Sequence, residues 1–226
     1  MARTIIRKYW TAWLLTICCL LLFVIPSVPV QAAPTMTTSI DEIDAWQIVS
    51  GGAVGEGNAD QISDSYATIL YIEVALIEAV AQDGVTVLVE VSYADDNWMK
   101  LFEVKGTAET AATTTLSTEE VSGQTVLSLT DATAGDFDVV GRKWFIKDGT
   151  IGNSESVRTK SVSTNDVTVL QDTLRLHATA SNDYDRVDEW TVSIPFGVAW
   201  VRTIIINTDA DCDVAFTTRI SKVTGL

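Results

Sequence analysis

The stretch "GVTVLVEVS", residues 84–92, alternates valine with other side chains over almost its whole length. Because successive side chains of a β-strand point to opposite faces of the sheet, this spacing predicts a strand with one apolar face. That face carries Val85, Val87, Val89 and Val91. The segment "ADDN" (Ala94–Asn97) has turn chemistry and separates this strand from a second apolar run, Trp98–Val104. The sequence therefore predicts two neighbouring strands joined by a turn.

Similar runs lie on both sides of this pair. Tyr66–Gln82 contains good helix formers in "EVALIEAVAQDG", but its clean alternation and its β-branched residues favour a strand. Near the C-terminal end, Trp190–Ile194, Trp200–Ile206 and Val214–Ile220 alternate in the same way. The turn residues at Asn207–Asp211 predict that the last two runs form an antiparallel hairpin with one buried face.

The region between these halves, residues 123–180, has shorter apolar runs separated by turns rich in Gly, Asn, Asp and Ser. Its predicted strands are Val126–Thr130, Lys143–Lys147, Val157–Val162 and Val167–Leu170. This close spacing is typical of a small β-barrel or sandwich.

The N-terminal half has too few strands to close a sandwich alone. We therefore predict an all-β fold, an antiparallel β-sandwich of the jelly-roll or immunoglobulin-like kind, formed jointly by residues 44–122 and 181–226. Residues 123–180 are expected as an inserted small β-barrel-like module, and residues 33–43 as a linker.

Residues 1–32 have the layout of a secretory signal peptide, with Arg3, Arg7 and Lys8 before an apolar stretch and small residues at its end. Cleavage is expected after Ala32 or Ala33. The alternative is a retained membrane anchor, since the apolar stretch is just long enough to span a bilayer. The localisation predicted from cleavage is secreted, cell-surface or periplasmic.

The full chain has a formal net charge of −15, and the leader contributes only basic residues, so the cleaved chain is more acidic still. Such a charge excludes nucleic acid as a partner and opposes binding to anionic membranes after cleavage. The cleaved chain also contains a single cysteine, Cys212, so no intramolecular disulfide can stabilise it. Its stability must come from a hydrophobic core.

No cofactor is predicted, with the exception of a calcium ion at the acidic turn "NTDADCD". Asp209, Asp211 and Asp213 would supply the clustered oxygen ligands that calcium prefers, although the turn lacks the glycine and the distal glutamate of an EF-hand loop. The alternative is that these carboxylates are solvated turn residues. The single histidine, His177, is expected to be structural, and no motif for nucleophilic catalysis accompanies it. We therefore predict that the protein is not an enzyme.

Two further regions are candidates for contact with a partner. Trp98 lies beside the "ADDN" turn and is the tryptophan expected to be exposed, where its flat ring could stack on a glycan. The loop containing Asp148, Asn153 and Glu155 is the part of the inserted module expected to touch another molecule.

The segment "VVGRKWFIKDGTIGNSESVRTKSVSTNDVTVLQDTLRLHA", residues 139–178, resembles a β-module of structural proteins in tailed-bacteriophage particles. The flanking segments at residues 70–101 and 203–223 are similar to the strands that frame this module in such virion proteins. The resemblance rests on turn-and-strand patterns, and it implies a role in building or decorating a particle. It carries no catalytic residues to this chain.

These observations predict a non-enzymatic, exported structural subunit of a surface layer, a fibre or a virion-like particle. Its partners would be further copies of the chain or other particle subunits, and its localisation would be the virion if the protein is phage-derived. The alternative is a secreted β-sandwich module that binds carbohydrate or calcium.

Overall fold

The computed structural model describes residues 37–43, 45–178 and 182–224, so the predicted signal peptide lies outside the described residues. The described chain forms eighteen β-strands and two 3-10 helices, Asp136–Asp138 (η1) and Ile151–Asn153 (η2), and it contains no α-helix. Within these ranges, no helix has the length and hydropathy needed to cross a membrane. The all-β prediction is confirmed, and the strands belong to several antiparallel sheets.

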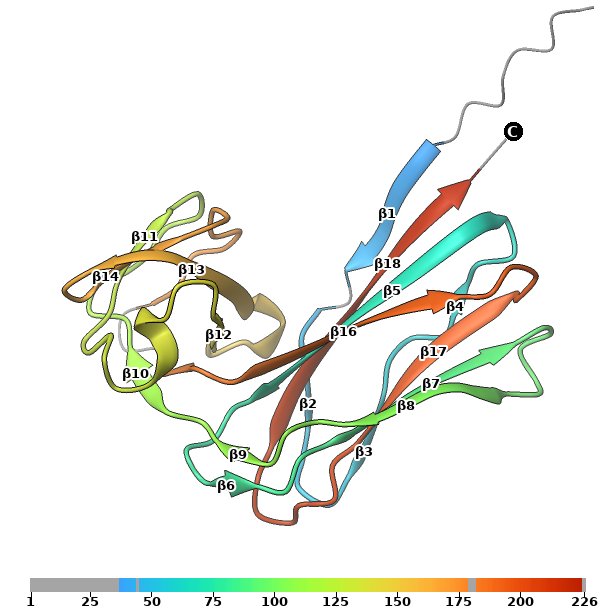
Figure 1. The fold of residues 1–226 in the computed structure, drawn as a ribbon, viewed down its shortest axis with the longest axis horizontal. Helices are drawn as coiled ribbons and strands as arrows, with labels where there is room; N and C mark the ends of the chain where they lie inside the picture. Colours follow the sequence, from blue (N-terminus) through green and yellow to red (C-terminus); the bar gives the residue numbers. More distant parts are fainter. Residues whose placement is uncertain (1–36, 44, 179–181, 225–226) are drawn as a thin grey trace, which may run out of the picture. The chain divides into compact units, whose positions relative to one another are not determined.

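The first sheet contains the longest strands (Figure 1). In spatial order they are β1 (Thr37–Ile43), β18 (Val214–Thr224), β5 (Ser65–Leu76) and β16 (Val187–Ile194), and β2 (Gln47–Val49) also pairs with β18. β5 lies between β18 and β16 and pairs with both along almost its whole length. Residues 37–43, expected in a linker, therefore form an edge strand of this sheet.

The second sheet is built around the two strands predicted from the valine-rich stretch. Its order is β3 (Val54–Glu56), β17 (Trp200–Ile206), β7 (Thr86–Ser92) and β8 (Met99–Lys105), and β4 (Asp60–Gln61) also pairs with β17. β7 and β8 are neighbours joined by the predicted turn. A separate pair consists of β6 (Ala81–Gln82) and β9 (Glu109–Thr110).

The first and second sheets share one hydrophobic core, as a β-sandwich requires. Val87 and Val89 of β7 are fully buried, and Ile72 of β5 is fully buried in the same cluster. Full burial of each such side chain contributes about 1.5–3 kcal/mol. Valine therefore alternates along β7 because one face of the strand is buried in this core.

The predicted hairpin at the C-terminal end is wrong. β17 belongs to the second sheet and β18 to the first, so the segment Asn207–Asp211 crosses from one sheet to the other. Asn207 is buried, and its amide group donates hydrogen bonds to the carbonyls of Cys212 at 2.7 Å and Val49 at 3.3 Å. These bonds hold the crossing segment in place. Alternation alone could not reveal it, because strands of a hairpin and strands of facing sheets have the same pattern.

The strand predicted over Tyr66–Gln82 is confirmed as far as Leu76, where β5 ends, and is wrong as one continuous strand beyond that residue. The N–H of Leu76 donates a hydrogen bond to the carbonyl of Arg186, just before β16 begins. Residues 78–80 form a bend, and Ala81–Gln82 then form the separate short strand β6. The end of β5 is therefore determined by where its partner strand β16 begins, and the sequence of β5 itself does not contain this information.

A third sheet of six strands has a hydrophobic core of its own. Its order is β10 (Thr113–Thr115), β15 (Asn182–Tyr184), β12 (Lys143–Ile146), β13 (Glu155–Ser163), β14 (Asp166–Val169) and β11 (Val126–Ser128). The four short strands predicted within residues 123–180 are all present, with ends that differ by about two residues. β10 and β15 lie outside the range expected for the inserted module, and the division into domains stays a prediction.

Candidate functional site

The acidic turn proposed for calcium uses its carboxylates to bind the backbone. Asp209 accepts hydrogen bonds from the N–H groups of Asp211 at 2.9 Å and Asp83 at 3.1 Å, and these bonds lower the pKa of Asp209. Asp213 accepts a hydrogen bond from the N–H of Gly51 at 3.0 Å. Within the described residues, no group of three or more His, Cys, Asp or Glu side chains is arranged to hold a metal ion. Calcium binding here stays a prediction, and the turn geometry gives it no support.

Cys212 lies in the same turn and is buried, and its thiol donates a weak hydrogen bond to the carbonyl of Ala81. Burial, together with the charge of Asp209, raises the pKa of the Cys212 thiol to about 11. The thiol is therefore protonated at neutral pH and behaves as a packing group.

Trp98 is only partly exposed, because the guanidinium of Arg202 lies over its ring at 4.2 Å from the ring centroid. Arg202 is itself held by Glu90 at 2.7 Å and Glu56 at 2.6 Å. One face of the indole ring is thus occupied by a cation that is fixed in place. This arrangement reduces the surface that Trp98 offers for stacking on a glycan.

The three residues proposed as a contact loop do not act together at the surface. Glu155 is buried, and its carboxylate accepts a hydrogen bond from the N–H of Leu174 at 3.0 Å and lies 2.5 Å from Nε2 of His177. Asp148 accepts a hydrogen bond from the N–H of Thr150, and Asn153 accepts one from the guanidinium of Arg175. His177 is fully buried, as expected for a structural histidine.

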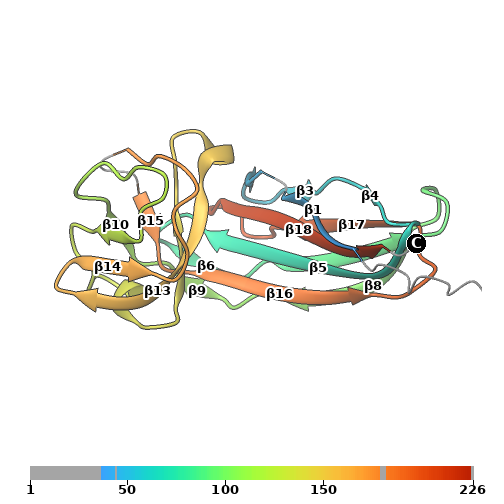
Figure 2. The same ribbon diagram turned by 90° about the horizontal axis from the view of Figure 1, so that it is seen from above.

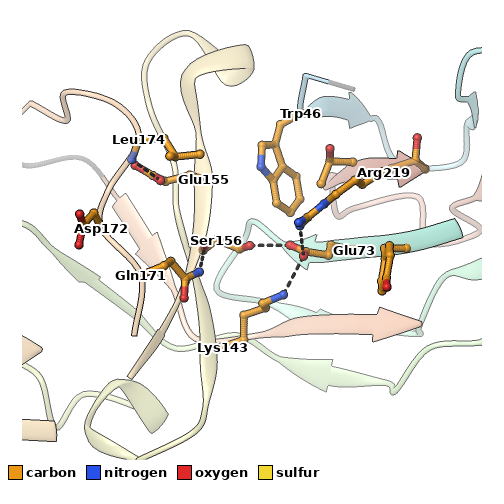
Figure 3. A pocket seen from close by; sticks show the side chains of 12 residues that line it. Trp46, Glu73, Lys143, Glu155, Ser156, Gln171, Asp172, Leu174 and Arg219 are labelled. Atoms are coloured by element: carbon orange, nitrogen blue, oxygen red, sulfur yellow. Dashed lines mark hydrogen bonds and ion pairs between the residues drawn. The ribbon is translucent and has the colours of Figure 1, made fainter. Parts of the chain in front are cut away.

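A cleft of about 320 Å³ lies between the outer face of the first sheet and strands β12 and β13 (Figure 3). The sequence alone did not point to it. It is lined by Trp46, Tyr71, Glu73, Lys143, Glu155, Ser156, Gln171, Asp172, Leu174, Thr217, Thr218 and Arg219. Its volume is in the range of small ligand sites.

Strand alternation places the charged groups of this cleft. On β12, Trp144 and Ile146 point into the core of the third sheet, so Lys143 and Phe145 point the other way, toward the first sheet. Phe145 packs there against Trp46, with ring centroids 4.5 Å apart, and belongs to the sandwich core. This contact fixes the position of the neighbouring Lys143.

Glu73 is the centre of the cleft. It lies on β5, directly opposite Glu189 of β16, and is 7% exposed. Its Oε1 atom lies 2.7 Å from Nζ of Lys143 and 3.9 Å from the guanidinium of Arg219, and its Oε2 atom accepts a hydrogen bond of 2.5 Å from Oγ of Ser156 (Figure 3). The carboxylate therefore has partners on both oxygens.

Glu189 shares the same lysine. Its carboxylate lies 2.9 Å from Nζ of Lys143 and 2.6 Å from the guanidinium of Arg158. Burial alone would raise the pKa of Glu189, but the hydrogen bonds from Lys143 and Arg158 outweigh it, so the pKa lies below its ordinary value of 4.5. Two carboxylates that would repel each other across the sheet are thus neutralised from the third sheet.

The sequence contained one signal for this site. Glu73 interrupts the apolar run "LYIEVAL", and a glutamate in such a run must be paired if it is buried. Its partners lie on other strands, and Lys143 is 70 residues away along the chain. Chemically, the fold brings together at Glu73 and Lys143 an amine, the carboxylates of Glu73 and Glu189, the hydroxyl group of Ser156 and a guanidinium.

A second feature is an exposed apolar end of the sandwich, defined here as the aromatic end. Ile194 pairs with Thr68, and Trp200 pairs with Ser92, so the segments before β5, between β7 and β8, and between β16 and β17 lie at the same end (Figure 2). The large apolar side chains exposed there are Tyr66 (56%), Tyr93 (63%), Met99 (46%) and Phe196 (78%). The rings of Tyr66 and Phe196 stack with centroids 6.4 Å apart.

Comparison with known proteins assigns no family. No family model and no curated protein matches the chain. Among solved structures, VP17, a capsid protein of bacteriophage P23-77, is similar with 10% sequence identity and a TM-score of 0.15, over 83% of this chain and 99% of that protein. So low a TM-score does not establish a shared fold, and the function is argued from the residues.

Proposed function

We propose that this chain is a non-enzymatic, exported structural subunit that associates with further copies of itself in a surface layer, a fibre or a phage-like particle. The observation that carries the proposal is the aromatic end. Phe196 and Tyr66 are side by side and more than half exposed, and such apolar surface is stabilised when a partner covers it. Burial of a phenylalanine side chain contributes about 1.5–3 kcal/mol.

The backbone around Phe196 is suited to presenting this ring. Pro195 restricts the chain before it, and Gly197 follows it with a φ of 91°, a conformation that favours glycine. Val198 then returns to the sandwich core. Because the loop is restrained before association, little conformational entropy is lost when the ring is covered.

The charge of the chain determines how association should respond to salt. A formal net charge of −15 opposes nucleic acid, and it also makes two copies repel each other. Salt screens this repulsion and strengthens apolar contacts. We therefore expect association to increase with ionic strength, which is the opposite of binding to nucleic acid.

The test is the molar mass in solution, measured by light scattering during size-exclusion chromatography over a range of protein and salt concentrations. Phe196→Ser should weaken association by about tenfold or more, since the lost burial corresponds to at least 1.4 kcal/mol. Val140→Ser is the matched control, because Val140 is 69% exposed and lies away from the aromatic end. A wild-type chain that stays monomeric under all conditions, or equal effects of the two substitutions, would contradict the proposal.

Export is a separate part of the proposal, supported by the layout of residues 1–32. The mass of the N-terminal peptide of the protein recovered outside the producing cell tests it. We expect that peptide to begin at Ala33 or Pro34. A chain found only inside the cell, or one that still carries Arg3, would count against cleavage and export.

The alternative of a carbohydrate-binding module is favoured by one observation. The rings of Tyr66 and Phe196 are more exposed, and so more accessible to a sugar ring, than Trp98. Binding of soluble oligosaccharides, lost in Phe196→Ser and retained by a wild-type chain that does not associate, would favour this reading over assembly.

A further inference from the structure

The ion pair between Lys143 and Glu73 differs from the other ion pairs of the described chain. Lys143 is the least exposed of the lysine and arginine side chains in those pairs, at 12%, and the side chain of Glu73, taken without its backbone, is 10% exposed. The Nζ atom of Lys143 contacts a carboxylate on each of two neighbouring strands, Glu73 on β5 and Glu189 on β16. The amine of Lys143 is therefore held within contact distance of both carboxylates. Figure 3 shows its contact with Glu73.

We propose that Lys143 and Glu73 condense to form an intramolecular amide bond, which covalently joins β12 to β5. In this step the Nζ–Cδ bond forms, and one C–O bond of the Glu73 carboxyl group breaks. The ammonium group loses two protons, and these leave with the departing oxygen as one water molecule. No oxidant, reductant or other reactant is needed.

Each neighbouring group has a defined role in this condensation. Glu189, 2.9 Å from Nζ, accepts a proton from the amine and passes it toward the departing oxygen. Ser156 donates a hydrogen bond to Oε2 of Glu73, and Arg219 lies 3.9 Å from Oε1. Both stabilise the negative charge that develops on the carboxyl oxygens when nitrogen adds to the carbon.

The surroundings favour the amide for two reasons. Groups held in a reactive geometry behave as if present at effective concentrations of about 10⁵–10⁸ M, which offsets the slow reaction of amines with carboxylates in water. A buried ion pair also carries a desolvation cost, whereas an amide has no net charge. Condensation removes two charges from a cleft that is nearly closed to solvent at this point.

The bond would take the place of a disulfide, for which the described residues contain no second cysteine. Cys212 is the only cysteine among the described residues and is buried. A bond between Glu73 and Lys143 would close a loop of about 70 residues and connect the first sheet to the third. This inference is independent of the proposed assembly function, since it concerns a different surface and has a different readout.

The first experiment measures the intact mass of the full chain under denaturing conditions. The wild type should be lighter by the mass of one water molecule than its processed sequence requires. Proteolysis should release a branched peptide that contains both Glu73 and Lys143. A mass equal to that of the sequence, with no branched peptide even after prolonged incubation of the folded protein, would overturn the proposal.

Two variants separate the amide from an ordinary ion pair. Lys143→Arg keeps the positive charge but should show no loss of water. Glu189→Gln keeps the pair between Lys143 and Glu73 but removes the proton acceptor, so the bond should form at least about tenfold more slowly. Circular dichroism checks that both variants fold. Loss of water in Lys143→Arg would show that another pair reacts, and an unchanged rate in Glu189→Gln would overturn the role given to Glu189.

Discussion

Glu73 and Asp183 are both acidic residues buried within β-strands, and their surroundings are opposite. Glu73 in the cleft has Lys143 and Ser156 as hydrogen-bond partners and Arg219 nearby. Asp183 on β15 is fully buried, and neither of its carboxyl oxygens has a hydrogen-bond partner. Burial, and to a lesser extent the charge of Glu120, raises the pKa of Asp183 well above its ordinary value of 3.8.

The difference shows two ways of tolerating an acid in a sheet. At Glu73, for as long as it has not condensed with Lys143, the charge is kept and neutralised by groups from other strands, so removal of a partner leaves a buried charge uncompensated. At Asp183 the charge itself is disfavoured, and the side chain is accommodated best when it is protonated. Substitutions at the two sites should therefore have opposite signs.

The largest effect is expected for Lys143→Met, which leaves Glu73 buried without its closest cation. Loss of one partner of a buried ion pair costs about 3–5 kcal/mol, measured in urea as the free energy of unfolding relative to Lys143→Arg, which keeps the cation but cannot form the proposed amide. The double variant Lys143→Met with Glu73→Leu should regain a large part of this loss, because no unpaired charge remains. A Lys143→Met variant as stable as Lys143→Arg would show that Ser156 and Arg219 compensate for the lysine.

Asp183→Asn should be stabilising at pH 7, by about 1–2 kcal/mol, because it removes a charge that burial disfavours. The folded wild type holds its proton more tightly than the unfolded chain does. Its stability relative to the variant therefore falls as pH rises from 3.8 toward the raised pKa of Asp183, and then stays level. Thermal unfolding of both proteins between pH 4 and pH 8 measures the difference. A variant less stable than the wild type across this whole range would contradict the assignment.

The smallest effect is expected at an exposed pair. Lys100 and Glu103 on the edge strand β8 form an ion pair at 2.5 Å, with side chains 60% and 49% exposed. Lys100→Ala should change the free energy of unfolding by about 0.5 kcal/mol or less, since water and salt screen such pairs. The same urea titration provides the measurement. A loss of stability comparable to that of Lys143→Met would show that burial does not explain the different contributions of the two ion pairs.

The sequence was sufficient for features that depend on neighbouring residues. The valines of β7 alternate because one face meets the core, and this local periodicity predicted the all-β class and most strands. It failed at Asn207–Asp211, where the choice between a hairpin and a crossing depends on the sheet that β18 joins. Local patterns contain no information about partners that are distant in the chain.

The candidate sites were less predictable for the same reason. Glu155 looked like an exposed loop residue, but backbone N–H groups from the segment at Leu174, and His177, surround its carboxylate. Glu73 acquires its role only when β12 brings Lys143 to it. The exposure of Phe196 was also missed, since Phe196 lies between two predicted strands, where the strand pattern gives no information on exposure.

The order of strands in the first sheet has a consequence for the nascent polypeptide. β18 is the most C-terminal described strand, yet it lies between β1 and β5 and pairs with both. During translation the first sheet cannot be completed until β18 has left the ribosome. Until then β1 and β5 lack the strand that lies between them. A first sheet that stays open until β18 has been synthesised suits threading of the chain through a secretion channel, as the proposed export requires.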